Sequence, residues 1–187
     1  MDSDGYLSQL ADIFNGITVN TPSISAIIAI VLAGVLLLAS GFASASEIAF
    51  FSLTPSDRND IDEQNHPSDE KISALLGDSE RLLATILITN NFVNVTIIML
   101  CNFFFMSVFE FHSPIAEFLI LTVILTFLLL LFGEIMPKIY SAQKTLAFCR
   151  FSAPGIYALE KVFYPIASVL VRSTTFLNKP FAKKNHN

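Results

Sequence analysis

The stretch Ile24–Ser46, ISAIIAIVLAGVLLLASGFASAS, runs for 23 residues without an acidic or basic side chain. A helix of about 20 apolar residues crosses a bilayer, so this stretch predicts a transmembrane helix. A second uncharged stretch, Leu82–Phe109, has 28 residues, and a third, Phe118–Gly133, has 16. The third is extended by residues 115–117 and by those after Glu134, which favours a spanning helix over a buried or re-entrant one. These stretches predict an all-α membrane protein with three transmembrane helices.

The composition agrees with a membrane protein. Of the 187 residues, 53% are hydrophobic and 14% are charged, whereas about a quarter of the residues in soluble proteins are charged. The net charge of −5 and the lack of a basic stripe argue against a nucleic-acid partner. Cys101 and Cys149 are too few for a disulfide framework and are expected to be free thiols. The expected partner is therefore a lipid bilayer.

The basic residues alternate along the chain. None precedes Arg58, three lie between the first two spans, none lies between the second and third spans, and eight follow Glu134. The start of the chain thus lacks the positive region of a signal peptide, and the positive-inside rule predicts an outside N-terminus and a cytoplasmic C-terminus. The predicted domains are an extracytoplasmic segment, 1–23, a three-span domain, 24–141, with a cytoplasmic loop, 54–81, interfacial belt helices, 142–177, and a linker, 178–187, that is expected to be cut from something longer.

Helix-start signals mark the loop and the beginning of the second span. Thr54 followed by Pro55, and Asp78 just before the second span, are typical residues at helix N-termini, so short helices are expected near the inner surface. In the tail, Glu160 and Lys161 would lie near the middle of a fourth span, where charges are costly. We therefore expect a kinked interfacial helix there, with a fourth crossing as the less favoured alternative.

Polar side chains cluster inside the three predicted spans, where each needs a partner or a function. At about 1.5 Å per residue, Ser40 and Asn90 are expected at similar depths, about 16 and 14 Å from the cytoplasmic side. All the groups are oxygen donors without His or Cys, which indicates a hard cation such as Mg²⁺, Ca²⁺ or Na⁺. In chain order, the clusters are Ser40, Ser44 and Glu47, then Asn90, Asn91 and Asn94, then Gly133, Glu134, Pro137 and Lys138.

We interpret these clusters as one polar pocket that opens toward the cytoplasm. Glu134 alone cannot neutralise a divalent ion, and Glu47 would bring the formal charge to −2. Backbone carbonyls near Gly41, Gly133 and Pro137 could complete the shell of ligands.

Simpler interpretations of the same residues remain open. The small residues around Ser44 could serve close helix packing, and the asparagines could form hydrogen bonds between helices. Glu134 and Lys138, at i and i+4, could be an ion pair within one helix.

Three motifs resemble the transmembrane domain of the CNNM/CorC family of magnesium transporters. They are SGFASASE at Ser40–Glu47, LATILITNNFVN at Leu83–Asn94 and FGEIMPK at Phe132–Lys138. Their order and spacing cover most of residues 24–141, and the sequence looks closest to the bacteroidete gliding-motility-associated branch. Ala45 and Thr89 stand where glycine is common in the family, and Ala45 could narrow access of the backbone to the cavity.

The resemblance implies a homodimer of three-helix units in the bacterial inner membrane, each holding a dehydrated Mg²⁺ in an inward-open cavity and coupling its export to Na⁺ entry. It also implies cytoplasmic CBS domains that bind adenine nucleotide and would lie beyond this chain. Carried onto this sequence, the resemblance gives a set of metal ligands and a set of surrounding pocket residues. The ligands are Ser40, Ser44, an asparagine of the pair Asn90 and Asn91, and Glu134, and the surrounding residues are Gly41, Glu47, Asn94, Gly133, Pro137 and Lys138.

The leading hypothesis is therefore the membrane domain of a Mg²⁺ transporter. The alternative is a membrane scaffold without transport activity, for example a component of a motility or secretion complex. An enzyme is not expected, because neither Gly-x-Ser-x-Gly nor His-Glu-x-x-His occurs and all three histidines lie outside the spans.

Overall fold

The computed structural model describes the backbone of residues 3–182 and the side chains of residues 4–176. Three helical segments in this part of the chain are long and apolar enough to cross a membrane. The first two are the single helices α2 (Ile24–Phe51) and α5 (Ser79–Val108). The third comprises α6 (Pro114–Leu128), the π-helical η1 (Leu129–Ile135) and α7 (Met136–Gln143). The predicted all-α fold with three spanning helices is confirmed.

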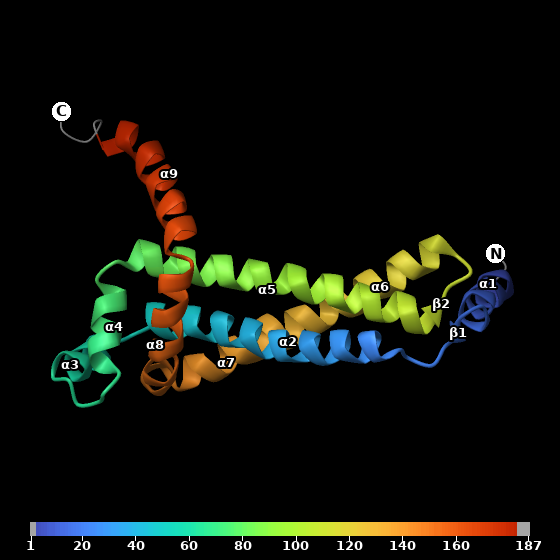
Figure 1. Ribbon diagram of the computed structural model, residues 1–187, viewed down its shortest axis with the longest axis horizontal. Coiled ribbons are helices and arrows are strands. Elements are labelled where there is room, and N and C mark those ends of the chain that lie inside the picture. Colours follow the sequence, from blue (N-terminus) through green and yellow to red (C-terminus); the bar gives the residue numbers. More distant parts are fainter. Residues whose placement is uncertain (1–2, 183–187) are drawn as a thin grey trace.

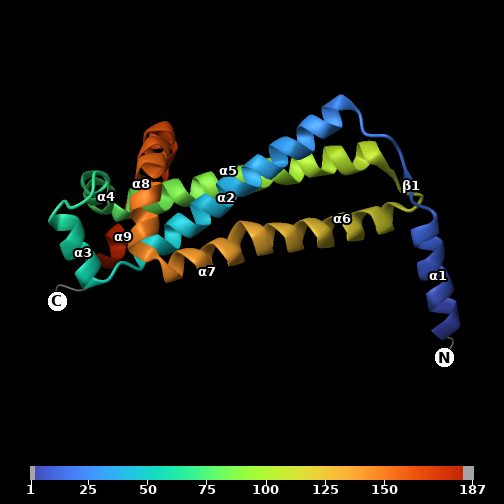
Figure 2. The ribbon, with the colours of Figure 1, turned by 90° about the horizontal axis from the view of Figure 1, so that it is seen from below.

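The spanning helices follow the long axis of the molecule, and shorter elements gather at its two ends (Figures 1 and 2). One end carries α3 (Pro55–Asp62) and α4 (Asp69–Leu76), with α8 (Thr145–Val162) lying across the bundle and α9 (Tyr164–Ala182) leading away from it. The other end carries α1 (Ser3–Asn15) and a two-stranded ribbon. Helix α2 is central, because it packs against α5, η1, α7 and α8.

Capping side chains explain where these helices begin. Ser23 caps α2 by accepting a hydrogen bond from the N–H of Ala26, and Ser113 caps α6. Thr54 and Asp57 form a reciprocal capping box at the start of α3, while Asp78 caps α5. Such caps satisfy N–H groups that the first helical turn leaves unpaired. The helix starts predicted at Thr54 and Asp78 are confirmed.

Proline explains why the third span is irregular. Pro137 has no N–H, and its ring clashes with the carbonyl group four residues earlier in a regular α-helix. The helix widens upstream, and the N–H of Met136 bonds to the carbonyl of Leu131, five residues back. Short π segments of this kind occur frequently at functional sites. Gly133 and Glu134 both lie within this segment.

A buried ion pair joins the belt to the loop at the α3–α4 end. Asp69 in α4 is fully buried, and its two oxygens accept hydrogen bonds from Nε and Nη2 of Arg150 in α8 at 3.0 and 3.2 Å. The backbone N–H of His66 donates a further bond of 3.0 Å to the same carboxylate. Around this pair, apolar side chains of α2, α4, α5 and α8 form one continuous core.

The opposite end contains structure that the sequence did not predict. β1 (Thr18–Val19) pairs antiparallel with β2 (Phe109–Glu110) and so ties the N-terminal segment to the turn between α5 and α6. The carboxylate of Glu110 also accepts hydrogen bonds from Thr18 and Asn20. The preceding helix α1 is exposed along its length.

The tail after α7 consists of two helices, where the sequence predicted a kinked interfacial helix. Pro154 lies inside α8, and the chain changes direction at Phe163 before α9. Helix α9 extends to Ala182, within the range predicted as a linker, and residues 183–187 lie outside the described residues. The predicted domain boundaries stay predictions.

Candidate ion site

The polar residues of α2 and α5 meet in the middle of the bundle. The hydroxyl oxygen of Ser40 lies 2.9 Å from Oδ1 of Asn90 and 2.6 Å from Oδ1 of Asn94. Ser40 is fully buried, while both asparagines are partly buried. Asn90 and Asn94 are four residues apart and therefore lie one above the other on the same side of α5. The similar depths expected for Ser40 and Asn90 are thus reflected in a direct contact.

This contact has more hydrogen-bond acceptors than protons to donate. A serine hydroxyl has one proton and can donate only one hydrogen bond at a time, yet two carbonyl oxygens face it at hydrogen-bonding distance. Either a cation completes the cluster or one amide turns its NH₂ group toward Ser40. The first arrangement is an oxygen-rich cation site, and the second is a hydrogen-bond bridge between two helices.

The third span approaches the same point through a glycine. A Cβ atom on Gly133 would lie 3.2 Å from the hydroxyl oxygen of Ser40, closer than ordinary van der Waals contact. On the next residue of α2, a Cβ atom on Gly41 would lie 3.0 Å from Cγ of Pro137 and 3.4 Å from the carbonyl oxygen of Phe132. These two glycines therefore let η1 and α7 approach α2 closely beside Ser40.

A second buried hydroxyl lies one turn along α2 from Ser40. Ser44 is fully buried, and its oxygen has no hydrogen-bond partner among residues 4–176. By contrast, the hydroxyl of nearby Ser46, also fully buried, donates to the carbonyl of Phe42 at 2.7 Å. An unpaired buried polar group costs about 1–3 kcal/mol. Ser44 therefore has an unused oxygen close to the oxygen cluster.

Lys138 approaches the first span and not its own helix. Its Nζ lies 4.0 Å from Oε2 of Glu47, and both side chains are partly exposed. The ion pair considered between Glu134 and Lys138 is therefore wrong for the part of the chain that the structure describes. The ammonium group of Lys138 therefore lies beside the carboxylate that Glu47 would bring to a cation.

The remaining predicted ligands are placed less directly. Glu134 is partly buried and follows Gly133 in the π-helical segment, and no hydrogen bond or ion pair to another described residue involves its carboxylate. Asn91 is exposed and lies outside the contact that Ser40 makes. Across residues 4–176, no group of three or more His, Cys, Asp or Glu side chains is arranged to hold a metal ion. Any cation here would therefore depend on neutral oxygens and few carboxylates.

Asn94 is the residue whose role the sequence underestimated, since we placed it only among the surrounding residues although it makes the shortest contact to Ser40. Its spacing of four from Asn90 was the available signal. Thr89, in contrast, satisfies its own hydroxyl by donating to the carbonyl of Thr85 at 2.8 Å. Such bonds are common for threonine in transmembrane helices.

Comparison with known proteins agrees with this architecture. Residues 28–187 match the family model described as the cyclin M (CNNM) transmembrane N-terminal domain. A UPF0053 protein from Haemophilus influenzae is 32% identical over 130 residues, and another from Synechocystis is 26% identical over 140 residues. The alignments cover 70% and 75% of this chain but only 30% and 39% of those relatives. The chain therefore belongs to the CNNM transmembrane-domain family.

Proposed function

We propose that this chain is the membrane domain of a Mg²⁺ transporter and that the cluster of Ser40, Asn90 and Asn94 binds the ion. The observation that carries the proposal is the convergence of three side-chain oxygens with one shared hydroxyl proton. A cation would satisfy all three oxygens at once. The hydroxyl of Ser44, which has no hydrogen-bond partner within the described part of the chain, would supply a fourth oxygen one turn away.

The chemistry of these groups favours a hard cation. Hydroxyl and amide oxygens suit Mg²⁺, Ca²⁺ or Na⁺, whereas zinc and copper favour His or Cys. Glu134 directly follows Gly133, which approaches Ser40 closely, and among the described residues it is not paired with Lys138. In the proposal, Glu134 supplies the negative charge and the four neutral oxygens replace water.

Coupling to Na⁺ and export from the cell are part of the same proposal and rest on the family resemblance. With the predicted topology, the cluster lies in the cytoplasmic half of the membrane, so cytoplasmic Mg²⁺ would enter first. Mg²⁺ gives up its water reluctantly, and fixed oxygens reduce the cost of removing it. Export would then require the same oxygens to become accessible from the other side, as in alternating access.

Mg²⁺ flux in proteoliposomes tests the proposal. We expect Asn90→Ala and Glu134→Gln each to lower Na⁺-dependent Mg²⁺ flux at least tenfold. Thr96→Val is a matched control, since Thr96 is also a polar residue of α5 but bonds only to the carbonyl of Phe92, at 2.8 Å. Wild-type flux in both site variants would reject these ligands.

A membrane scaffold is the competing function, and the close packing at Gly41 and Pro137 favours it. In that case the asparagines would only join helices, and the wild-type protein would show neither Mg²⁺ flux nor Mg²⁺-dependent stability. The homodimer, the CBS domains of the longer protein and the bacterial inner-membrane location stay predictions.

A further inference from the structure

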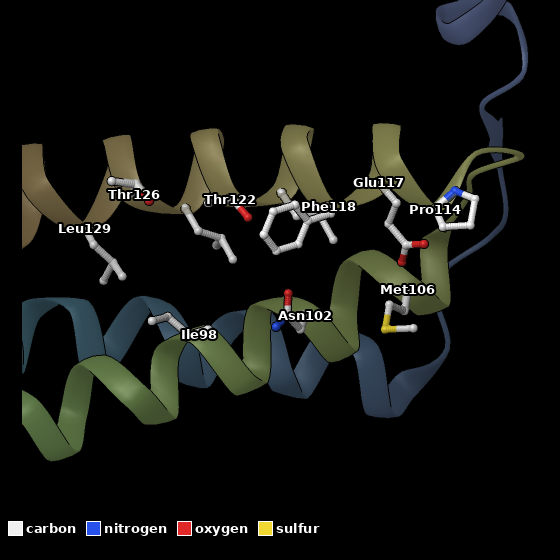
Figure 3. A pocket seen from close by; sticks show the side chains of 11 residues that line it. Ile98, Asn102, Met106, Pro114, Glu117, Phe118, Thr122, Thr126 and Leu129 are labelled. Atoms are coloured by element: carbon white, nitrogen blue, oxygen red, sulfur yellow. The ribbon is translucent and has the colours of Figure 1, made fainter.

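A cavity of about 530 Å³ separates α5 from α6 in the half of the bundle nearer the β1–β2 ribbon (Figure 3). The cavity is open along one side of the bundle, and most of its lining side chains are apolar, but polar side chains from both helices also line it. Asn102 reaches in from α5, and Thr122 and Glu117 reach in from α6 on the opposite side. The carboxylate of Glu117 lies near the end of the cavity that is closest to the ribbon.

Local interactions do not account for these polar groups. Thr96 and Ser107 on α5 donate to the carbonyl groups four residues earlier. Within the described residues, no hydrogen bond involves the side chain of Asn102 or Thr122, and Glu117 has no ion pair. The first turn of α6 is a favourable place for an acidic residue because of the helix dipole. That effect does not explain why an amide and a hydroxyl face the same cavity.

The cavity continues the line of the proposed ion site along α5. Asn90, Asn94, Ile98 and Asn102 follow one another at intervals of four residues. At about 1.5 Å per residue, Asn102 lies about 12 Å from Asn94 along the helix axis. Ile98, together with Leu129 of η1, lines the cavity between these two levels. Apolar side chains, these two among them, therefore lie between the two polar regions.

We propose that this cavity is the extracytoplasmic vestibule through which the cation leaves, with Glu117 attracting cations and Ile98 and Leu129 forming the barrier that must part. The proposal rests on the transport function proposed above and adds the second half of the route. It also uses the predicted topology, which places the ribbon outside the cell. Its volume of about 530 Å³ leaves room for a cation together with its bound water.

Thiol labelling from the outside tests water access without requiring transport. In the protein lacking its native thiols (Cys101→Ala, Cys149→Ala), Thr122→Cys is compared with Val123→Cys. Both positions are exposed on the surface of the isolated chain, but only Thr122 lines the cavity. The probes are membrane-impermeant methanethiosulfonates, one cationic and one anionic. We expect Thr122→Cys to react at least tenfold faster than Val123→Cys, with the cationic reagent favoured.

Glu117→Gln tests the source of that preference. A single charge within several ångströms, partly screened by water, changes such a rate ratio by about three- to tenfold, so the cationic preference should fall by that factor. Asp4→Asn, on exposed α1, is the matched control and should leave the ratio unchanged.

The outcomes separate the two proposals. If neither Thr122→Cys nor Val123→Cys reacts, lipid fills the cavity and the vestibule is rejected, whereas Mg²⁺ flux still decides the function of the ion site. Reaction at Thr122→Cys with no response to Glu117→Gln would reject the role of Glu117. Labelling as expected in a protein without Mg²⁺ flux would reject transport, and the exit role with it, while leaving a water-filled cavity.

Discussion

Two polar clusters in this protein differ in whether their own residues satisfy them. At Asp69 and Arg150, opposite charges meet in a two-pronged contact, and a backbone N–H completes it. At Ser40, two carbonyl oxygens face one hydroxyl proton, and Ser44 nearby has no partner among the described residues. The first cluster is complete without a ligand and holds α4 against α8. The second has acceptor oxygens that no described donor satisfies, which suits reversible binding of a cation.

The largest expected effect comes from breaking the complete cluster. Removing one partner of a buried ion pair costs about 3–5 kcal/mol, because the other charge is left unpaired. We expect Asp69→Ala to lower the free energy of unfolding by about 3 kcal/mol, since Arg150 is still partly exposed. Thermal or denaturant unfolding in detergent measures this change, and added Mg²⁺ should not restore it.

Asp62→Ala is the control for that experiment, because Asp62 is exposed on neighbouring α3. A loss below 1 kcal/mol in Asp69→Ala would show that the contact does not hold the belt in place.

The next effect concerns the approach of the third span to Ser40. Gly133→Ala would place a methyl group 3.2 Å from the Ser40 hydroxyl oxygen and should disturb the cluster. We expect Mg²⁺ affinity to fall about tenfold, which corresponds to about 1.4 kcal/mol. Gly34→Ala is the matched control, because a Cβ atom on Gly34 meets nothing within 4 Å. Equal affinities in the two variants would show that η1 does not shape the site.

Replacing two buried serines by alanine is expected to change stability in opposite directions. Ser44→Ala removes a hydroxyl that has no partner in residues 4–176 and should raise stability in the absence of Mg²⁺ by about 1 kcal/mol. Ser46→Ala removes a hydroxyl that already donates to Phe42 and should lower stability by about 1 kcal/mol. Unfolding in EDTA measures both changes. A loss of stability in Ser44→Ala would mean that this hydroxyl has a partner within the protein.

The smallest effect is expected in the belt, at Glu160. Burial, followed by the charge of Asp78, raises the pKa of this carboxyl above its usual value, while Arg81 acts in the opposite direction. Because the folded-state pKa is raised, the folded form is favoured at low pH and loses stability as the pH rises through that pKa. Glu160→Gln should therefore stabilise the protein at pH 7 and flatten the pH dependence, by less than about 1 kcal/mol given solvent screening.

Unfolding between pH 4 and 8 measures the effect of Glu160→Gln, with Glu80→Gln on the exposed first turn of α5 as the control. An unchanged pH profile would show that Glu160 is solvated when the protein is folded.

Much of the fold could be predicted because its causes are local. Uncharged stretches of sufficient length gave the three spans, and Thr54 and Asp78 gave two helix starts. The β1–β2 ribbon could not be predicted, since two-residue strands pair across some 90 residues of sequence. The π-helical segment could not be predicted either, because helical periodicity does not show how the helix widens upstream of Pro137.

The candidate site was predictable to the level of depth along each helix. Counting residues placed Ser40 and Asn90 at similar depths, and the structure shows that the two side chains are in contact. Depth along the helix does not fix how α5 is rotated about its own axis. It therefore could not show that Asn91 is exposed while Asn94 contacts Ser40. Nor could it show that Lys138 pairs with Glu47 on another helix, because that contact depends on how α2 and α7 pack.

Mg²⁺-dependent thermal unfolding tests most directly whether the oxygen cluster at Ser40 binds the ion. A ligand that binds only the folded state at 100 times its Kd adds about 2.7 kcal/mol of stability. We predict a rise in Tm with Mg²⁺ concentration for the wild-type protein and for Thr96→Val, and almost no rise for Ser40→Ala or Asn94→Leu. The same Mg²⁺-dependent rise in all four proteins would contradict binding at this cluster.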